Sequence, residues 1–299
     1  MMFRITALLL LSSTLFASIV QDVRSQIAKG DFAAGERLIA EYRKSQGVTP
    51  EMILGLSWLG RGALAAKQYE KADAYAAETR NLALAELKKR QLDAESNLPL
   101  ALGASIEVQS QAAAALGERD QAVKFLNAEI ARWKGTSIIT RLNKNLNLLS
   151  LEGKPAPTIN AKDFLGGKAP SRKGQPVLMF LWAHWCGDCK GQAPILARIK
   201  KEHPGLAIVG LTQRYGYAAG GREVSPAEEL KYIDHVRQTD PAYTALPDMP
   251  TAVSEETFSK LGASSTPTIV LVDSKGIVQM YHPGKITYEE LSARVAALK

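Results

Sequence analysis

The sequence predicts two halves of different fold class, an all-α helical-repeat half followed by an α/β half with a central mixed sheet flanked by helices. Three observations carry this prediction. Apolar residues have helical spacing before residue 150, two prolines fall within residues 151–157, and strand-like apolar runs alternate with helices afterwards. The length of 299 residues suggests about two domains, and 46% hydrophobic with 22% charged residues is ordinary for a globular protein.

Residues 18–149 are expected to form about five to seven antiparallel helices. Helix-forming residues dominate this half, and proline occurs only at Pro50 and Pro99. Gly30 and Gly47 lie where breaks between helices are expected. Because this half carries no catalytic pattern, we expect it to serve docking or dimerisation through a helical surface.

The α/β half, residues 150–299, contains apolar runs that predict a sheet. Three of them are continuous, as buried strands require: 177–182, 206–211 and 268–272. Residues 277–281 return as a hairpin partner of the last run. Helix starts are marked by Ser225 before Pro226 and by the capping pattern of residues 287–290.

The first 17 residues read as a secretory signal peptide. Arg4 precedes a short apolar stretch, and small residues follow, with cleavage expected after Ala17. The stretch is shorter than the roughly 20 residues of a spanning helix, so an uncleaved anchor is the alternative. No cysteine follows it, which excludes a bacterial lipid anchor. Export would place the cysteine pair in a compartment where it can be oxidised.

The chemistry is predicted at Trp185-Cys186-Gly187-Asp188-Cys189-Lys190, which follows a predicted buried strand directly and opens a helix. That context makes a CxxC pattern a redox motif. At the helix start, the N–H groups and the dipole lower the pKa of the Cys186 thiol. We expect Cys186, the more exposed cysteine, to attack and Cys189 to resolve the mixed disulfide, so that they form a redox-active disulfide. Half of a zinc site is disfavoured, because no second ligand pair exists.

At these residues the chain resembles the thioredoxin superfamily. Trp-Cys-Gly-X-Cys-Lys is its signature, Pro194 stands where its first long helix kinks, and Thr266-Pro267 matches its cis-proline. The resemblance implies a thioredoxin-like fold in which Thr266 and Pro267 bind an extended substrate beside the disulfide. Trp185 would offer substrate an apolar surface, or simply shield the helix end. Residues 153–157 further resemble exported reductases of the TlpA and ResA type, which are bacterial envelope proteins.

Part of the helical half resembles a tetratricopeptide repeat. Residues 58–63 carry a Leu-Gly pair followed by a small residue. At the family's spacing follow Tyr69, Ala72 and Ala76. Residues 30–35 and 117–122 echo the same turn and second helix. Their spacings depart from the family period of about 34 residues, so a plain helical bundle is the alternative.

Single residues depart from the thioredoxin pattern. Phe180 stands where thioredoxins carry a buried acid, and Gln192 where cytochrome-maturation members carry Glu. Asp188 replaces the usual proline between the cysteines, and a carboxylate beside a thiolate disfavours the charged form. A less stable thiolate means a more reducing couple. We expect Gly187, Asp188 and His184 to tune the thiol, with a protonated His184 offsetting Asp188.

A long insertion, about residues 212–254, separates the second predicted strand from the cis-proline region. It contains an aromatic, glycine-rich loop at residues 215–221 and a predicted helix at residues 226–238. It is either a substrate-recognition lid or a segment that merely packs on the sheet.

The sequence therefore predicts an exported thiol–disulfide oxidoreductase of the periplasm or cell envelope, reducing protein disulfides through Cys186 and Cys189. Its expected partners are protein thiol and disulfide substrates, a membrane electron-donor reductase by family resemblance, and a possible protein on the helical half. One alternative is a helical-repeat adaptor whose thioredoxin-like half docks or senses redox state. A thioredoxin-like peroxidase is a weaker one, because His184-Trp185 replaces the Pro/Thr-rich approach of that class.

Other function classes find no support in the composition. The net charge of +7 comes without a long Lys/Arg run, so nucleic-acid binding is not indicated. Four scattered histidines and two cysteines show no metal-ligand spacing. No cofactor motif is visible, and we expect none.

Overall fold

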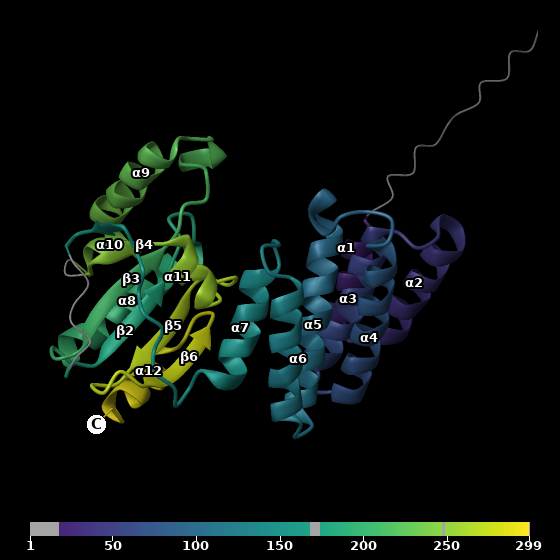
Figure 1. Cartoon of the computed structure of the whole chain (residues 1–299), viewed down its shortest axis with the longest axis horizontal. Coiled ribbons are helices and arrows are strands. Elements are labelled where there is room, and N and C mark those ends of the chain that lie inside the picture. Colours follow the sequence, from purple (N-terminus) through teal and green to yellow (C-terminus); the bar gives the residue numbers. More distant parts are fainter. Residues whose placement is uncertain (1–17, 168–173, 247–248, 299) are drawn as a thin grey trace, which may run out of the picture. The chain divides into compact units, whose positions relative to one another are not determined.

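The structure, a computed structural model, describes residues 18–167, 174–246 and 249–298 (Figure 1). The predicted signal peptide, residues 1–17, lies outside the described residues. Contacts separate the described residues into two compact units that divide between Ser105 and Ile106. In the described ranges, no helix combines the length and the apolar character that a membrane span needs.

Two helices of the first unit begin at capping side chains. The unit contains α1 (Ile19–Ala28), α2 (Phe32–Gln46), α3 (Pro50–Ala65), α4 (Tyr69–Glu86), the short 3-10 helix η1 (Leu92–Ala94) and the first part of α5 (Asn97–Ala115). Asp31 and Thr49 cap α2 and α3 by accepting hydrogen bonds from N–H groups of the first turn. Gly30 and Gly47 precede these caps with φ of 77° each, so the breaks predicted there are confirmed.

Helices α3 and α4 approach closely at the small residues that the sequence singles out. A Cβ atom on Gly60 would lie 3.6 Å from the Ala72 carbonyl oxygen and 3.6 Å from the Ala76 nitrogen. Any side chain larger than that of alanine would push the two helices apart. A tetratricopeptide-like arrangement of the helices stays a prediction.

The second unit begins with the rest of α5 and continues with α6 (Arg119–Arg132) and α7 (Ile139–Ser150). Seven α-helices are therefore present in the described residues up to 150, at the upper end of the predicted number. Helix α7 ends beside the domain boundary that the sequence predicts near residue 150, and that boundary stays a prediction.

A mixed sheet follows, with six strands in the described part of the chain. They are β1 (Asp163–Leu165), β2 (Val177–Leu181), β3 (Ala207–Thr212), β4 (Thr251–Val253), β5 (Thr268–Val272) and β6 (Val278–Pro283). Their spatial order is β1-β4-β3-β2-β5-β6. The pairs β2–β3 and β3–β4 are parallel, and the other pairs are antiparallel. The four longer strands lie where the sequence predicts them, whereas β1 and β4 were not predicted.

Both faces of the central strand β2 are buried under helices. Leu178 and Phe180 face one core, which also holds residues of α8 (Gly187–Glu202), α9 (Pro226–Thr239), α10 (Pro241–Thr244) and α12 (Tyr288–Ala296). Val177 and Met179 face the other core, which includes Phe258 of α11 (Glu255–Lys260). This second half of the chain has the thioredoxin-like fold, a mixed sheet flanked by helices (Figure 1).

The insertion between β3 and β4 forms regular structure that joins the sheet and α8. It contains a 3-10 helix η2 (Ala219–Gly221) and the helices α9 and α10, and α9 starts at the predicted position, where Ser225 and Glu228 form a capping box. Lys190 of α8 pairs with Asp240 at 2.8 Å, and Arg214 pairs with Asp163 of β1 at 2.7 Å. The insertion is therefore tied to the helix that carries the cysteine motif.

Candidate active site

The two cysteines form a disulfide at the start of α8. Cys186 is the N-cap residue, its Sγ lies 3.0 Å from the Cys189 backbone nitrogen, and the two Cα atoms are 5.2 Å apart. The strand β2 ends at Leu181, so a short connection leads directly into the motif. Cys186 is 3% exposed and Cys189 is fully buried, which is the order of exposure that the sequence predicts.

Trp185 and Gly187 border the disulfide on the surface. The Trp185 residue is 50% exposed, and a Cβ atom on Gly187 would meet no atom within 4 Å. Trp182, in contrast, is fully buried against Tyr243 with ring centroids 4.6 Å apart, as a core residue should be. The site therefore presents one large aromatic surface and open space beside a nearly buried disulfide.

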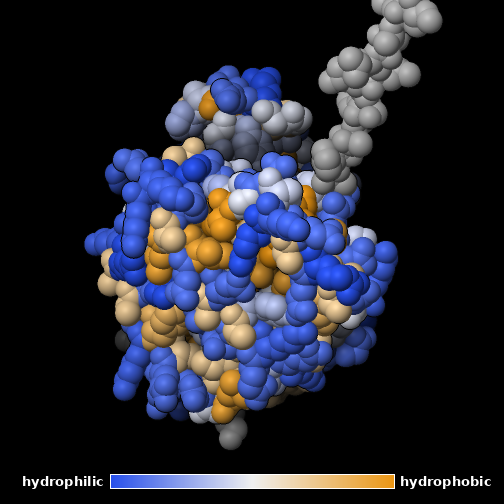
Figure 2. Space-filling view, turned by 90° about the vertical axis from the view of Figure 1, so that its right-hand side faces the viewer, coloured by the Kyte–Doolittle hydropathy of each residue, from blue (hydrophilic) through white to orange (hydrophobic). Residues whose placement is uncertain are grey.

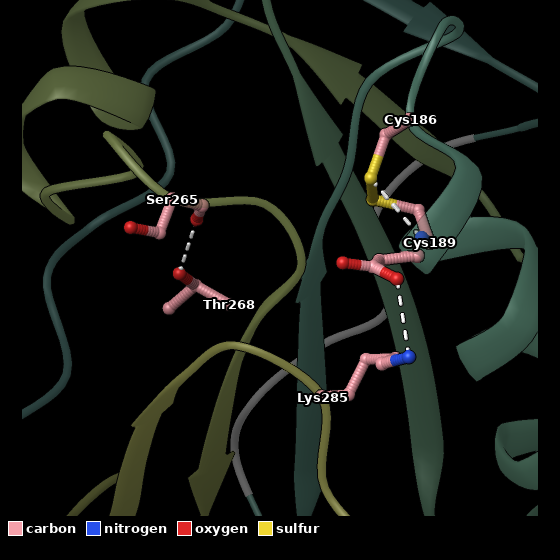
Figure 3. The surroundings of a disulfide bond; sticks show 6 residues. Cys186, Cys189, Ser265, Thr268 and Lys285 are labelled. Carbon is pink, nitrogen blue, oxygen red and sulfur yellow. Dashed lines mark hydrogen bonds and ion pairs between the residues drawn. A yellow bond between two sulfur atoms is a disulfide. The ribbon is translucent and has the colours of Figure 1, made fainter. Parts of the chain in front are cut away.

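The cis-proline loop meets the motif at the same end of the sheet. The Thr266–Pro267 peptide bond is cis, as the sequence predicts. Thr268, the first residue of β5, pairs with Leu181, the last residue of β2, so the two loops leave neighbouring strand ends. Figure 3 shows Ser265 and Thr268, on either side of this peptide, in the surroundings of the disulfide. The structure thus brings together the segments that the sequence singles out.

Asp188 has a partner that the sequence does not reveal. Lys285 Nζ lies 3.1 Å from the Asp188 carboxylate. Figure 3 shows Lys285 in the surroundings of the disulfide. Lys285 belongs to the loop between β6 and α12, and the side chains of both residues are more than half exposed. A cation thus stands next to the carboxylate that was predicted to disfavour the thiolate.

His184 is buried in a cage of aromatic rings. The rings of Tyr215, Tyr217 and Tyr232 lie nearly perpendicular to its imidazole, at centroid distances of 5.2 to 5.6 Å. Burial lowers the pKa of His184, and Glu229, with an oxygen 3.5 Å from Nε2, opposes this only in part. The neutral form is therefore favoured, and the positive charge beside Asp188 comes from Lys285 rather than from His184.

Glu229 holds the aromatic loop of the insertion in place. Its buried carboxylate accepts hydrogen bonds from the backbone nitrogens of Tyr215 at 2.5 Å and Gly216 at 2.8 Å. The Tyr215 ring then meets Trp185 edge to face, with centroids 5.4 Å apart. The sequence singles out this loop but not Glu229, because nothing in the local sequence of α9 distinguishes Glu229 from a solvent-facing acid.

The two other departures from the thioredoxin pattern lie in the core beneath the motif. Phe180 is fully buried in the same cluster as both cysteines, so its position supplies no proton acceptor. Gln192 is also fully buried, and its Oε1 accepts a hydrogen bond from the Ile286 backbone nitrogen at 2.9 Å. Gln192 therefore links α8 to the loop that carries Lys285. In the described residues, no cluster of three or more His, Cys, Asp or Glu side chains is arranged to hold a metal ion.

The buried His184 predicts a stability that depends on pH. In the unfolded chain His184 takes up a proton near its ordinary pKa of 6.5, whereas in the folded protein burial lowers that pKa. The unfolded state therefore binds more protons, and the free energy of unfolding should fall as the pH drops from about 7 to about 5. Urea unfolding of the oxidised protein at several pH values measures this, and His184→Gln should flatten the profile.

His235, an exposed histidine on α9, supplies the matched control. His235→Gln should leave the pH profile as steep as in the unchanged protein. An equal slope for His184→Gln and the unchanged protein would contradict the role of the buried ring.

The curated proteins that match this chain include thioredoxin-like and thiol:disulfide interchange proteins. No protein-family model matches the chain. The thioredoxin-like protein YneN of Bacillus subtilis is 26% identical over 148 residues, covering 48% of this chain and 78% of that protein. The thiol:disulfide interchange protein DsbE of Haemophilus influenzae is 26% identical over 141 residues, covering 46% and 68%. The solved structure of StoA from Bacillus subtilis is 20% identical with a TM-score of 0.35, covering 48% of this chain and 99% of that one.

Proposed function

We propose, from its thioredoxin-like fold and its thiol:disulfide interchange homologues, that this chain is an exported thiol–disulfide oxidoreductase that reduces protein disulfides. The observation that carries the proposal is the Cys186–Cys189 disulfide at the N-terminus of α8, beside the exposed Trp185. That position supplies backbone N–H groups and the positive end of a helix dipole to a thiolate at Cys186.

The proposed reaction begins with both cysteines reduced. The Cys186 thiolate attacks one sulfur of the substrate disulfide, and the other substrate sulfur leaves as a thiolate and takes up a proton. Cys189 then loses its proton and attacks the Cys186 sulfur, which releases the second substrate thiol and closes the disulfide seen in the structure. Two electrons pass from the protein dithiol to the substrate, and an electron donor must reduce the protein again.

Substrate would bind across the loops that meet at the ends of β2 and β5. We assign to Trp185 the apolar contact, and to the backbone of Thr266 and Pro267 the pairing with an extended polypeptide. The pairing of Leu181 with Thr268 supports this assignment, because it places the two loops side by side. A membrane reductase as electron donor, and export through residues 1–17, belong to the same proposal.

The reduction potential and the turnover of a protein disulfide test this function. Equilibrated with glutathione, the chain from residue 18 onward should have a potential near about −270 mV, as thioredoxin has. A potential near about −120 mV would contradict the reductase direction, because such a couple donates disulfides. Cys186→Ser should abolish turnover, and Cys189→Ser should accumulate the mixed disulfide. Full turnover by Cys186→Ser would overturn the proposed chemistry.

The helical half, residues 18–149, is proposed as a separate tetratricopeptide-like docking domain. A hollow of about 590 Å³, with Ile19, Leu38 and Tyr42 among its lining residues, opens on its N-terminal helices. The face seen in Figure 2 also gathers hydrophobic residues within a hydrophilic border. Because α7 of this half also donates hydrogen bonds to α11, limited proteolysis within residues 151–157 should give two fragments that stay folded and associated. The alternative is an adaptor that has no catalytic activity. Such an adaptor would still bind its partner after Cys186→Ser, and neither this variant nor the unchanged chain would turn over a protein disulfide.

A further inference from the structure

Asp188 and Lys285 form an ion pair at the mouth of the disulfide. The Nζ–Oδ1 distance is 3.1 Å. Asp188 lies in the first turn of α8, and Lys285, labelled in Figure 3, lies in the loop between β6 and α12. Asp188 lies between the two cysteines in sequence, in the first turn of the helix whose N-cap is Cys186. Lys190, which follows Cys189 in α8, is paired with Asp240.

The loop that carries Lys285 is held in place on both sides. The Gly284 nitrogen donates a hydrogen bond to the Pro267 carbonyl at 2.8 Å, and the Ile286 nitrogen donates to Gln192 Oε1 at 2.9 Å. The Lys285 carbonyl itself lies 2.9 Å from His282 Nε2. The backbone of Lys285 is therefore fixed against both the cis-proline loop and α8, although its side chain is exposed.

We propose that Lys285 is a positioning residue that sets the reduction potential of the Cys186–Cys189 couple by neutralising Asp188. Reduction breaks the S–S bond and adds two electrons and two protons, which leaves the Cys186 thiol in equilibrium with its thiolate. The Asp188 carboxylate penalises that thiolate, and an ammonium group paired with it removes much of the penalty. Lys285 therefore stabilises the reduced form and keeps the couple less reducing than Asp188 alone would make it.

The test rests on the proposed function but does not require turnover. The equilibrium constant for reduction of the protein disulfide by glutathione is measured in low salt for the full chain and its variants. For Lys285→Met we expect this constant to fall about two- to fivefold, which corresponds to a potential about 9 to 21 mV more negative. Asp188→Asn should raise the constant by a similar factor, and 1 M salt should shrink both effects.

A double variant tests whether Lys285 acts on the reduction potential through Asp188. Without Asp188 nothing holds the exposed ammonium group near the sulfur. In the Asp188→Asn background, Lys285→Met should therefore change the constant less than half as much, on a logarithmic scale, as in the unchanged chain. An equal factor in both backgrounds would mean that Lys285 does not act through Asp188, and the proposal would be overturned.

Two controls separate the electrostatic effect from a structural one. Lys260→Met removes the same charge from an exposed ion pair with Glu256 on α11, and it should leave the constant unchanged. Lys285→Arg keeps the charge and should restore the value of the unchanged chain. If Lys285→Met shifts the constant no more than Lys260→Met does, the proposal fails while the proposed function stands. If the unchanged chain reduces no protein disulfide, the proposed function fails while the shift in potential persists.

Discussion

Replacing Gly262 by alanine is expected to destabilise the second unit by about 4 kcal/mol or more. Gly262 follows α11 with φ of +69°, where a residue with a side chain already costs about 1–2 kcal/mol. A Cβ atom there would overlap the backbone nitrogen and Cα of Lys144, and it would lie 2.8 Å from the carbonyl carbon of Asn143. Because these atoms belong to the backbone of α7, no side chain can rotate away to make room.

The expected loss of stability is larger because side chains of α7 donate hydrogen bonds to the last carbonyls of α11. The side-chain amides of Asn143 and Asn147 donate hydrogen bonds to the carbonyls of Ser259 and Lys260, both at 2.9 Å. These carbonyls lie in the last turn of α11, where C=O groups lack the usual intrahelical partners. The Gly262 N–H, at 2.9 Å, is a further donor to the Ser259 carbonyl. Pushing the two helices apart at Gly262 would break both bonds.

Gly276 provides the matched control for this prediction. It also has a left-handed backbone, with φ of +83°, but a Cβ atom on it would meet nothing within 4 Å. Gly276→Ala should therefore cost only the backbone penalty of about 1–2 kcal/mol. Denaturant unfolding of both variants gives the comparison. Equal losses for the two would show that α7 and α11 do not pack as closely as the structure has them.

The parts of the fold that could be predicted from sequence are those with a local signal. The strands β2, β3 and β5 contain continuous apolar runs. Helix α9 begins where Ser225 precedes Pro226, a start signal that the sequence shows directly. The strands β1 and β4 have only three residues each and pair with one another across a long stretch of chain. No run of that length stands out from the surrounding loop, so their place follows from tertiary pairing alone.

The candidate site likewise contains residues that local sequence patterns reveal and residues that only the fold reveals. The cysteine motif and the cis-proline segment are local patterns, and the pairing of β2 with β5 places them at one end of the sheet. Lys285 and Glu229 are ordinary charged residues in their own segments, and only folding brings them to Asp188 and His184. The sequence of the insertion does not decide between a lid and a packed segment, because the hydrogen bonds of Glu229 and the ion pair of Asp240 follow only from the fold.

Glu107→Gln is expected to cost about 3 kcal/mol of unfolding free energy at neutral pH. The Glu107 side chain, on α5, is 17% exposed and accepts hydrogen bonds from Arg141 at 2.8 Å, Lys144 at 2.9 Å and Asn145 at 3.1 Å. Burial alone would raise the pKa of Glu107, but the charges and hydrogen bonds of Arg141 and Lys144 lower it from 4.5 to about 2. That difference corresponds to the expected loss, and glutamine would leave two largely buried cations without their counter-charge.

The same pKa fixes the pH window in which the loss disappears. Because the folded pKa lies below the unfolded one, the carboxylate stabilises the protein fully above about pH 4.5, and this contribution is lost as the pH falls toward 2. The gap in stability between the unchanged chain and Glu107→Gln should therefore shrink over that window and nearly vanish at its lower end. Glu256→Gln, which breaks an exposed ion pair on α11, should cost far less than Glu107→Gln at neutral pH. A gap for Glu107→Gln that stays constant down to pH 2 would show that the buried carboxylate is not ionised through its contact with Arg141 and Lys144.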